Sequence, residues 1–109
     1  MHIQHIALAE TWADAQLAGT YTVSTLGLEL ADVGFIHCSR PEQLEDVFEH
    51  FYADVTEPLL LLTIDTDLLT SPWQLDDVPG EALSFPHIYG PLNTSAVVSA
   101  EPLRSSASS

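Results

Sequence analysis

The strongest pattern along the chain is a helical repeat of apolar positions over residues 44–51. The repeat consists of Leu44, Val47, Phe48 and Phe51, at spacings of three and four residues. Such spacing places the apolar side chains on one face of a helix. Ser39 is a suitable N-cap, Glu42 completes a capping box, and Pro41 fits the first turn. The pattern therefore predicts an amphipathic helix that begins just after Ser39.

A second helix is predicted after the first apolar run of the chain. Thr11 and Asp14 have the spacing of a capping box, with Asp in place of the usual Glu. Trp12 and Ala15 follow as an apolar face, and Gly19 lies where a helix C-terminus favours a positive φ. These signals predict a short helix that ends at Gly19.

Short apolar runs predict the strands. The predicted strands are residues 3–8, 20–23, 34–39, 59–64, 73–75 and 96–103. The leucine-rich run 59–64 is typical of a central strand covered on both faces. Pro86 lies inside the apolar segment 85–91 and predicts a sheet edge or a break there. Residues 24–33 show no clear period and are predicted to form a surface loop.

The order of these elements indicates an α+β fold, because several strands accompany only two substantial helices. The length of 109 residues allows one domain. We place that domain at residues 1–103. Residues 104–109 form a serine-rich tail that we expect to be disordered.

The composition is strongly acidic and limits the classes of partner. Two Arg and no Lys stand against 16 Asp and Glu, which gives a formal net charge of −14. Such a surface repels phosphate backbones and anionic lipids, so we expect neither a nucleic-acid nor a membrane partner. The longest apolar run, Leu59–Leu62, is far shorter than the roughly 20 residues of a membrane span, and we expect a cytoplasmic protein. Cys38 is the single cysteine, so no intrachain disulfide can form.

The excess of carboxylates has two explanations that the sequence leaves open. One is a salt-rich cytoplasm that screens the self-repulsion, and the other is a genome that avoids lysine codons. The first explanation predicts that the midpoint of unfolding rises between low and molar KCl. A midpoint that does not rise would exclude salt adaptation.

Three of the five histidines lie within apolar, strand-like segments: His5, His37 and His87. Side chains alternate along a strand, so His37 shares a face with Phe35 and Ser39, and His87 shares one with Phe85 and Tyr89. If the two strands are neighbours, two imidazoles, a phenol and a hydroxyl surround one cleft suited to proton transfer. The alternative is that each histidine is a buried, hydrogen-bonded packing residue. His2 and His50 are interpreted as surface residues.

The predicted start of the helix after Ser39 is a second candidate feature. Its free N–H groups, the Ser39 hydroxyl and Arg40 are able to hold one phosphate or pyrophosphate beside His37. The alternative for Arg40 is a solvated side chain paired with Glu42 or Asp46. We expect no metal, because His37 and the neighbouring cysteine point to opposite faces of the strand. A zinc site remains open only if His5, His37 and His87 converge.

Two segments carry a family resemblance: residues 34–39 followed by 41–43, and residues 85–92. Together with His5, Trp12 and the tryptophan at position 73, they resemble the bacterial domain of unknown function 952 family. The resemblance extends from about Ile3 to Leu103. It implies a fold similar to that of ADP-ribosyltransferases, with a small split antiparallel sheet, two main helices and NAD as substrate.

The resemblance also implies roles for individual residues. His5 would bind a ribose hydroxyl of NAD, His37 with Ser39 would lie on the next motif strand, and Tyr89 would stack on nicotinamide. Of the phosphate-binding arginines of the related RNA 2′-phosphotransferases, the matching region here offers only Arg40. The glutamate of the transferases has no counterpart in the recognisable motifs. Glu81, four residues before Phe85, is the candidate that the loop offers.

Three hypotheses follow. The first is an NAD- or ADP-ribose-binding domain, with ADP-ribose transfer to an unidentified protein acceptor as its catalytic form. Here His37, His87 and Tyr89 are the candidate catalytic residues, and His5, Ser39 and Arg40 bind the ligand. The second is a non-catalytic module for another small ligand in the same cleft, and the third is a zinc-dependent hydrolase.

Overall fold

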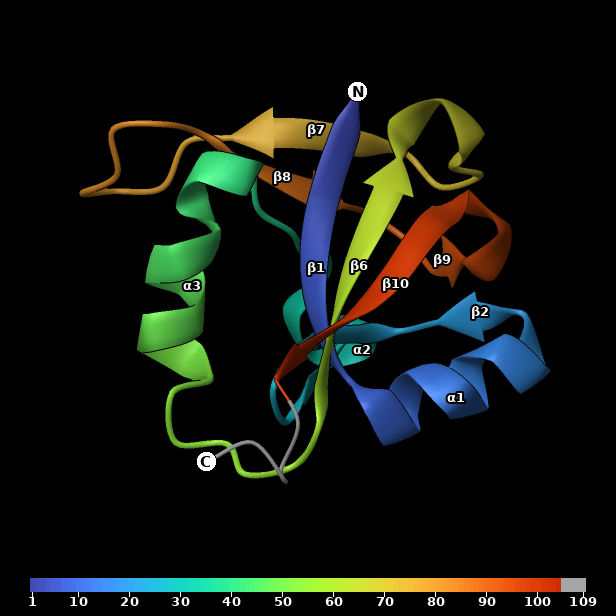
Figure 1. The fold of residues 1–109 in the computed structure, drawn as a ribbon. Helices are drawn as coiled ribbons and strands as arrows, with labels where there is room; N and C mark the ends of the chain where they lie inside the picture. The colour runs from blue at the N-terminus through green and yellow to red at the C-terminus, as the bar shows by residue number, and fades with distance from the viewer. Residues whose placement is uncertain (105–109) are drawn as a thin grey trace.

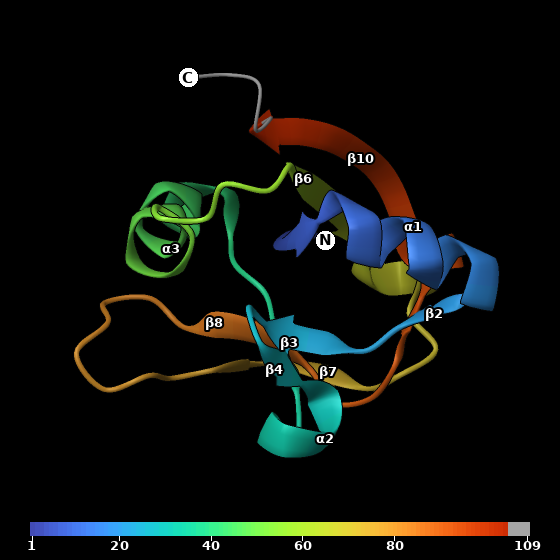
Figure 2. The same ribbon diagram turned by 90° about the horizontal axis from the view of Figure 1, so that it is seen from below.

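A computed structural model of the chain describes residues 1–104 and shows an α+β fold built from small antiparallel sheets. One three-stranded sheet has the order β1-β6-β10 and a second has the order β5-β8-β7. The first sheet consists of β1 (His2–Leu8), β6 (Leu59–Asp65) and β10 (Val97–Arg104). The second consists of β5 (Ile36–His37), β8 (Phe85–Ile88) and β7 (Trp73–Asp76). Figures 1 and 2 show that the second sheet crosses beneath the first.

Two short ribbons, three α-helices and three 3₁₀ turns complete the described part of the chain. The ribbons pair β2 (Thr20–Tyr21) with β9 (Leu92–Asn93) and β3 (Val23–Thr25) with β4 (Leu28–Glu29). The helices are α1 (Ala9–Ala18), α2 (Leu30–Val33) and α3 (Leu44–Phe51). In Figures 1 and 2, α3 and the loop between β7 and β8 lie on the same side of the molecule.

Strand β1 is covered on both faces, and it also pairs at one edge with the chain that leaves β5. Ile3 and Ala7 pack into a cluster with Trp12, whereas Ile6 packs into a second cluster with Val47. At the edge of β1, Gln4 and Ser39 exchange two backbone hydrogen bonds of 2.8 and 2.7 Å. The chain leaving β5 is thereby paired to the first sheet.

The predicted helix over residues 44–51 is confirmed, but the prediction of how it begins is wrong. A 3₁₀ turn at Pro41–Gln43 precedes α3, and its N-cap is Arg40 rather than Ser39. The Gln43 side chain accepts the Arg40 N–H at 2.9 Å, so this glutamine takes the place predicted for Glu42. Because the cap lies one residue later than predicted, the side chain that reaches back from the third position of the turn is Gln43.

The first helix is also confirmed, and it ends at Gly19 with a φ of 85° as predicted. It starts at Ala9, two residues before the expected cap Thr11. The predicted loop at residues 24–33 is wrong, because the β3–β4 hairpin and α2 occupy it. Gly27, with a φ of 77°, makes the tight turn of that hairpin.

The leucine-rich strand is central, as predicted, since β6 pairs with β1 on one side and β10 on the other. The prediction that Pro86 marks a sheet edge is wrong, because β8 lies between β5 and β7. An antiparallel residue directs its N–H and C=O to the same neighbour. The Pro86 carbonyl accepts the Cys38 N–H at 3.0 Å, just beyond the end of β5, so the missing proline N–H falls where that ladder stops.

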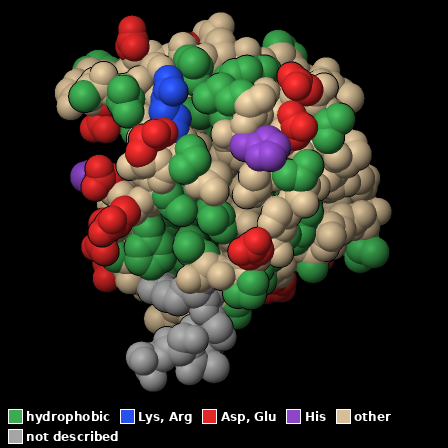
Figure 3. Space-filling view, turned by 45° about the horizontal axis from the view of Figure 1, so that its top comes forward, with side chains coloured by type: hydrophobic (Ala, Val, Ile, Leu, Met, Phe, Trp, Pro, Cys, Tyr) green, Lys and Arg blue, Asp and Glu red, His purple; other side chains and the backbone are tan. Residues whose placement is uncertain are grey.

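Acidic side chains are spread over the face drawn in Figure 3, where basic side chains cover only a small area. Within residues 1–104, none of the helices is both long enough and apolar enough to span a bilayer. The predicted tail at 104–109 lies outside the described residues, apart from the backbone of Arg104 at the end of β10.

Candidate functional site

Strand pairing brings His37 and His87 together. His37 lies directly opposite His87 in the β5–β8 ladder, and Gln74 of β7 lies opposite His87 on its other side. The Nδ1 atom of His37 is 3.3 Å from Nε2 of His87. The strand alternation read from the sequence thus places these two imidazoles on one face, as expected.

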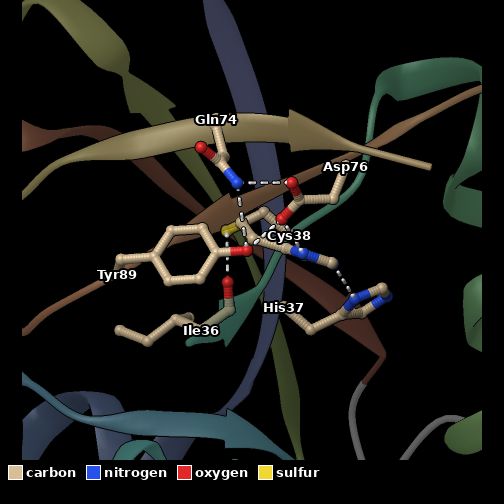
Figure 4. A network of polar contacts seen from close by, with 7 residues as sticks. Ile36, His37, Cys38, Gln74, Asp76 and Tyr89 are labelled. Atoms are coloured by element: carbon tan, nitrogen blue, oxygen red, sulfur yellow. Dashed lines mark hydrogen bonds and ion pairs between the residues drawn. The ribbon is translucent and has the colours of Figure 1, made fainter. Parts of the chain in front are cut away.

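Asp76 holds the far edge of His87. The Asp76 carboxylate lies 2.7 Å from His87 Nδ1, accepts the Gln74 amide at 2.6 Å, and also accepts the Tyr89 hydroxyl. Figure 4 shows Gln74 and Tyr89 directed toward Asp76, with His37 at the other end of the network. Phe35 stacks on the His87 ring with centroids 4.0 Å apart and planes 17° apart. The His87 ring is therefore fixed at both its edge and its face.

These contacts determine which nitrogen atoms carry protons. Hydrogen bonds from Tyr89 and His87 lower the pKa of Asp76, and an ionised carboxylate can only accept, so His87 donates from Nδ1. When Nε2 of His87 carries no proton it accepts, and His37 then donates from its own Nδ1. This assignment, inferred from the partners, leaves the Nε2 atom of His37 unprotonated.

Burial keeps His37 neutral. It lowers the pKa of His37 to about 4, with smaller contributions from the nearby His87 and His5. A neutral imidazole with a free lone pair can accept a hydrogen bond near pH 7. None of the described residues hydrogen-bonds Nε2 of His37.

His37 lies on the wall of a pocket of about 240 Å³ between α3 and the loop that joins β7 to β8. The apolar lining residues are Val47, Phe51, Val78 and Phe85, and the polar ones are His37, Asp46, His50 and Glu81. The His37 ring centroid is 5.1 Å from that of Phe85 and 6.3 Å from that of Phe51. The pocket therefore combines aromatic walls with two carboxylates and one oriented imidazole.

Arg40 holds the pocket loop and does not form the predicted anion site. Its guanidinium donates from Nε to the Ser84 carbonyl at 2.9 Å and from Nη2 to the Ser84 hydroxyl at 2.7 Å. Gln43 donates to the same carbonyl at 3.1 Å. The alternative pairing of Arg40 with Glu42 or Asp46 is also absent among the described contacts. Sequence reasoning missed this role because Ser84 is 44 residues away along the chain.

His5 is a packing residue in this structure and lies outside the pocket. Its side chain is 3% exposed, with Nδ1 2.7 Å from the His37 carbonyl and Nε2 2.9 Å from the Tyr21 hydroxyl. Burial lowers the pKa of His5 to about 4. Both ring nitrogens are thus used inside the core, which leaves neither of them free for the predicted contact of His5 with a ligand.

Ser39 and Tyr89 also lie away from the pocket lining. Ser39 is buried and joins β1 through its backbone. Tyr89 is 37% exposed and turns its hydroxyl to Asp76. Of the six predicted site residues, the structure brings His37, His87 and Tyr89 into one network, and only His37 reaches the pocket.

Metal ligands do not gather in the described part of the chain. No group of three or more His, Cys, Asp and Glu side chains there is arranged to hold a metal ion, and His5 does not converge with His37 and His87. Cys38 is buried, donates weakly to the Ile36 carbonyl, and has a pKa raised by burial.

The sequence analysis missed Asp76, the residue that orients His87. A signal for it was present, because a strand extended by one residue from 73–75 places Gln74 and Asp76 on one face by alternation. It also left Asp46 and Phe51 without a role in the site, although both belong to the confirmed helix α3. Glu81 is brought to the pocket by the loop.

The chain is similar to proteins of known structure. The crystal structure of protein CC0527 from Caulobacter crescentus is 26% identical, with a TM-score of 0.81 over 95% of this chain and 87% of that one. The solution NMR structure of CC0527 is 29% identical, with a TM-score of 0.71 over 91% and 81% of the two chains. None of the curated proteins compared with the chain matches it. The model of the family described as "Protein of unknown function (DUF952)" matches residues 6–100, so the chain belongs to the DUF952 family.

Proposed function

We propose that the chain binds a small molecule in the pocket beside His37 and that His37 accepts a proton or hydrogen bond from it. The observation that carries the proposal is the chain of contacts Asp76–His87–His37, which ends at a pocket wall and uses only Nδ1 of His37. A buried imidazole that only packs has both nitrogens satisfied, as His5 does. Nδ1 of His37 contacts His87, and Nε2 of His37 is available to a ligand.

The pocket limits the size of that molecule. Its volume of about 240 Å³ lies below the roughly 300–1,000 Å³ usual for drug-sized ligands. Such a space suits one ring with a short substituent between Phe51 and Phe85. A larger ligand would place only its ring end inside.

NAD is the candidate ligand that the family resemblance implies, and Glu81 favours it. With the nicotinamide end in the pocket, the Glu81 carboxylate would face the cationic ribosyl centre. In a transfer, nicotinamide would leave with the electron pair of its C–N bond, and an acceptor hydroxyl would bond to the ribosyl carbon. His37 would accept a hydrogen bond from that hydroxyl, whose proton would pass to water. The pyrophosphate would stay outside, because Arg40 is bound to Ser84.

His37→Ala is expected to weaken binding at the pocket at least tenfold while leaving a folded protein. A tenfold change corresponds to about 1.4 kcal/mol, the scale of one hydrogen bond to a ligand. The measurement is an NMR titration with NAD, nicotinamide and ADP-ribose that follows the signals of His37, Phe51 and Phe85. His2→Ala is the matched control, since His2 is an exposed histidine outside the pocket.

The possible outcomes test the identity of the ligand and the existence of the binding pocket separately. Shifts with NAD and nicotinamide that are lost in His37→Ala support the NAD form of the proposal. No shift with these two probes removes NAD. If a library of single-ring fragments also leaves the three signals unmoved, the pocket is not a binding site.

A further inference from the structure

Two carboxylates lie on the pocket wall, and the proposed function gives a role to only one of them, Glu81. Asp46, on α3, and Glu81, in the β7–β8 loop, both line the pocket. Neither carboxylate forms an ion pair with any residue that the structure describes. The arginine nearest in sequence, Arg40, has its guanidinium engaged with Ser84. The carboxylates therefore keep their negative charge available to whatever enters.

Three further residues of the wall, Phe51, Phe85 and His37, also favour a positive charge, and His50 adds an exposed imidazole. Phe51 and Phe85 present aromatic rings, whose faces attract cations. His37 is neutral because burial lowers its pKa to about 4, so it adds a lone pair and no positive charge. A formal net charge of −14 on the whole chain attracts cations toward the surface before they bind.

We propose that the pocket selects an organic cation, an ammonium group carried on a single ring or a short apolar body. The apolar body lies against Val47 and Val78, and the charged group lies between the aromatic rings and the two carboxylates. An anionic ligand of the same size is excluded by Asp46 and Glu81. This inference rests on the proposed binding pocket and adds the sign of the ligand's charge.

A matched pair of probes tests the charge alone. Benzyltrimethylammonium and benzyl alcohol both carry one benzyl ring, and only the first carries a positive charge. We expect the cation to bind about tenfold more tightly in titrations followed by the Phe51, Phe85 and His37 signals. Asp46→Asn combined with Glu81→Gln is expected to weaken the cation at least fivefold and to leave benzyl alcohol unchanged.

The control variant is Glu49→Gln, which removes an exposed carboxylate from the same helix outside the pocket lining. It is expected to change the affinity for the cation less than twofold, and unfolding midpoints check that every variant is folded. Equal affinities for the two probes, unaffected by the double variant, would overturn the charge selection and leave the proposed pocket standing. If neither probe moves the pocket signals although NAD, nicotinamide or another single-ring fragment does, the charge selection is overturned and the proposed pocket stands.

Discussion

Replacing His5 with alanine is expected to lower the free energy of unfolding by about 3–5 kcal/mol, because two buried partners lose their hydrogen bonds. The imidazole joins the His37 carbonyl to the Tyr21 hydroxyl, and burial leaves no water to replace it. The loss of the ring also opens a cavity beside Tyr21, whose ring centroid is 5.2 Å from that of His5. Urea unfolding monitored by tryptophan fluorescence measures this loss.

Two variants identify the cause of that loss. His5→Asn offers an amide nitrogen near the position of Nδ1, so it is expected to recover part of the stability through the His37 carbonyl. His2→Ala removes an exposed histidine from the same strand and is expected to change stability by less than about 0.5 kcal/mol. A loss in His5→Ala no greater than that in His2→Ala would show that the buried hydrogen bonds of His5 contribute nothing.

The protein is expected to lose several kcal/mol of stability between pH 6.5 and pH 4. Burial lowers the pKa of both His5 and His37 from 6.5 to about 4 in the folded state. Between these values the unfolded chain binds up to two more protons than the folded chain, so the free energy of unfolding falls as the pH falls. At about 1.4 kcal/mol per proton and pH unit, the loss is comparable with the whole stability of a small domain.

Urea unfolding at a series of pH values from 8 to 4 measures this dependence. Molar KCl in every sample screens the self-repulsion of the acidic chain, which protonation would otherwise relieve. His5→Asn removes one of the two titrating groups and is expected to flatten the dependence by about half. Asp76 contributes to the loss of stability only at lower pH. Its pKa is lowered in the folded state, so its contribution to stability is lost below the ordinary carboxyl pKa of 3.8. Stability that stays constant from pH 6.5 to 4.5 would show that neither histidine is held neutral by the fold.

The expected effect of His37→Ala differs from that of His5→Ala, although both substitutions replace a histidine of an apolar strand. His37 contacts one imidazole and a pocket, whereas both nitrogens of His5 have partners in the core. The first substitution is therefore expected to act on binding and the second on folding. The sequence analysis left these two readings of a strand histidine open, and only the number of partners separates them.

Local patterns in the sequence were sufficient for most secondary structure. The helix over residues 44–51 and the central strand at 59–64 were predictable because a buried face imposes a period on the chain. Alternation along two strands also indicated that His37 and His87 would meet if those strands were neighbours, which the structure shows them to be. The hairpin and short helix within residues 24–33 escaped because they bury few side chains and so leave little pattern.

The sequence by itself determined the fold class, the main elements and the residues that share a strand face with each histidine, because these depend on periods of two and 3.6 residues. The tertiary structure decided which groups surround each histidine. It placed Asp76 behind His87, Tyr21 beside His5, and Ser84 against Arg40. Periodicity states which face of an element is buried, but not which distant element covers it. The candidate site depends on contacts between segments far apart in the chain, so only the folded structure could define it.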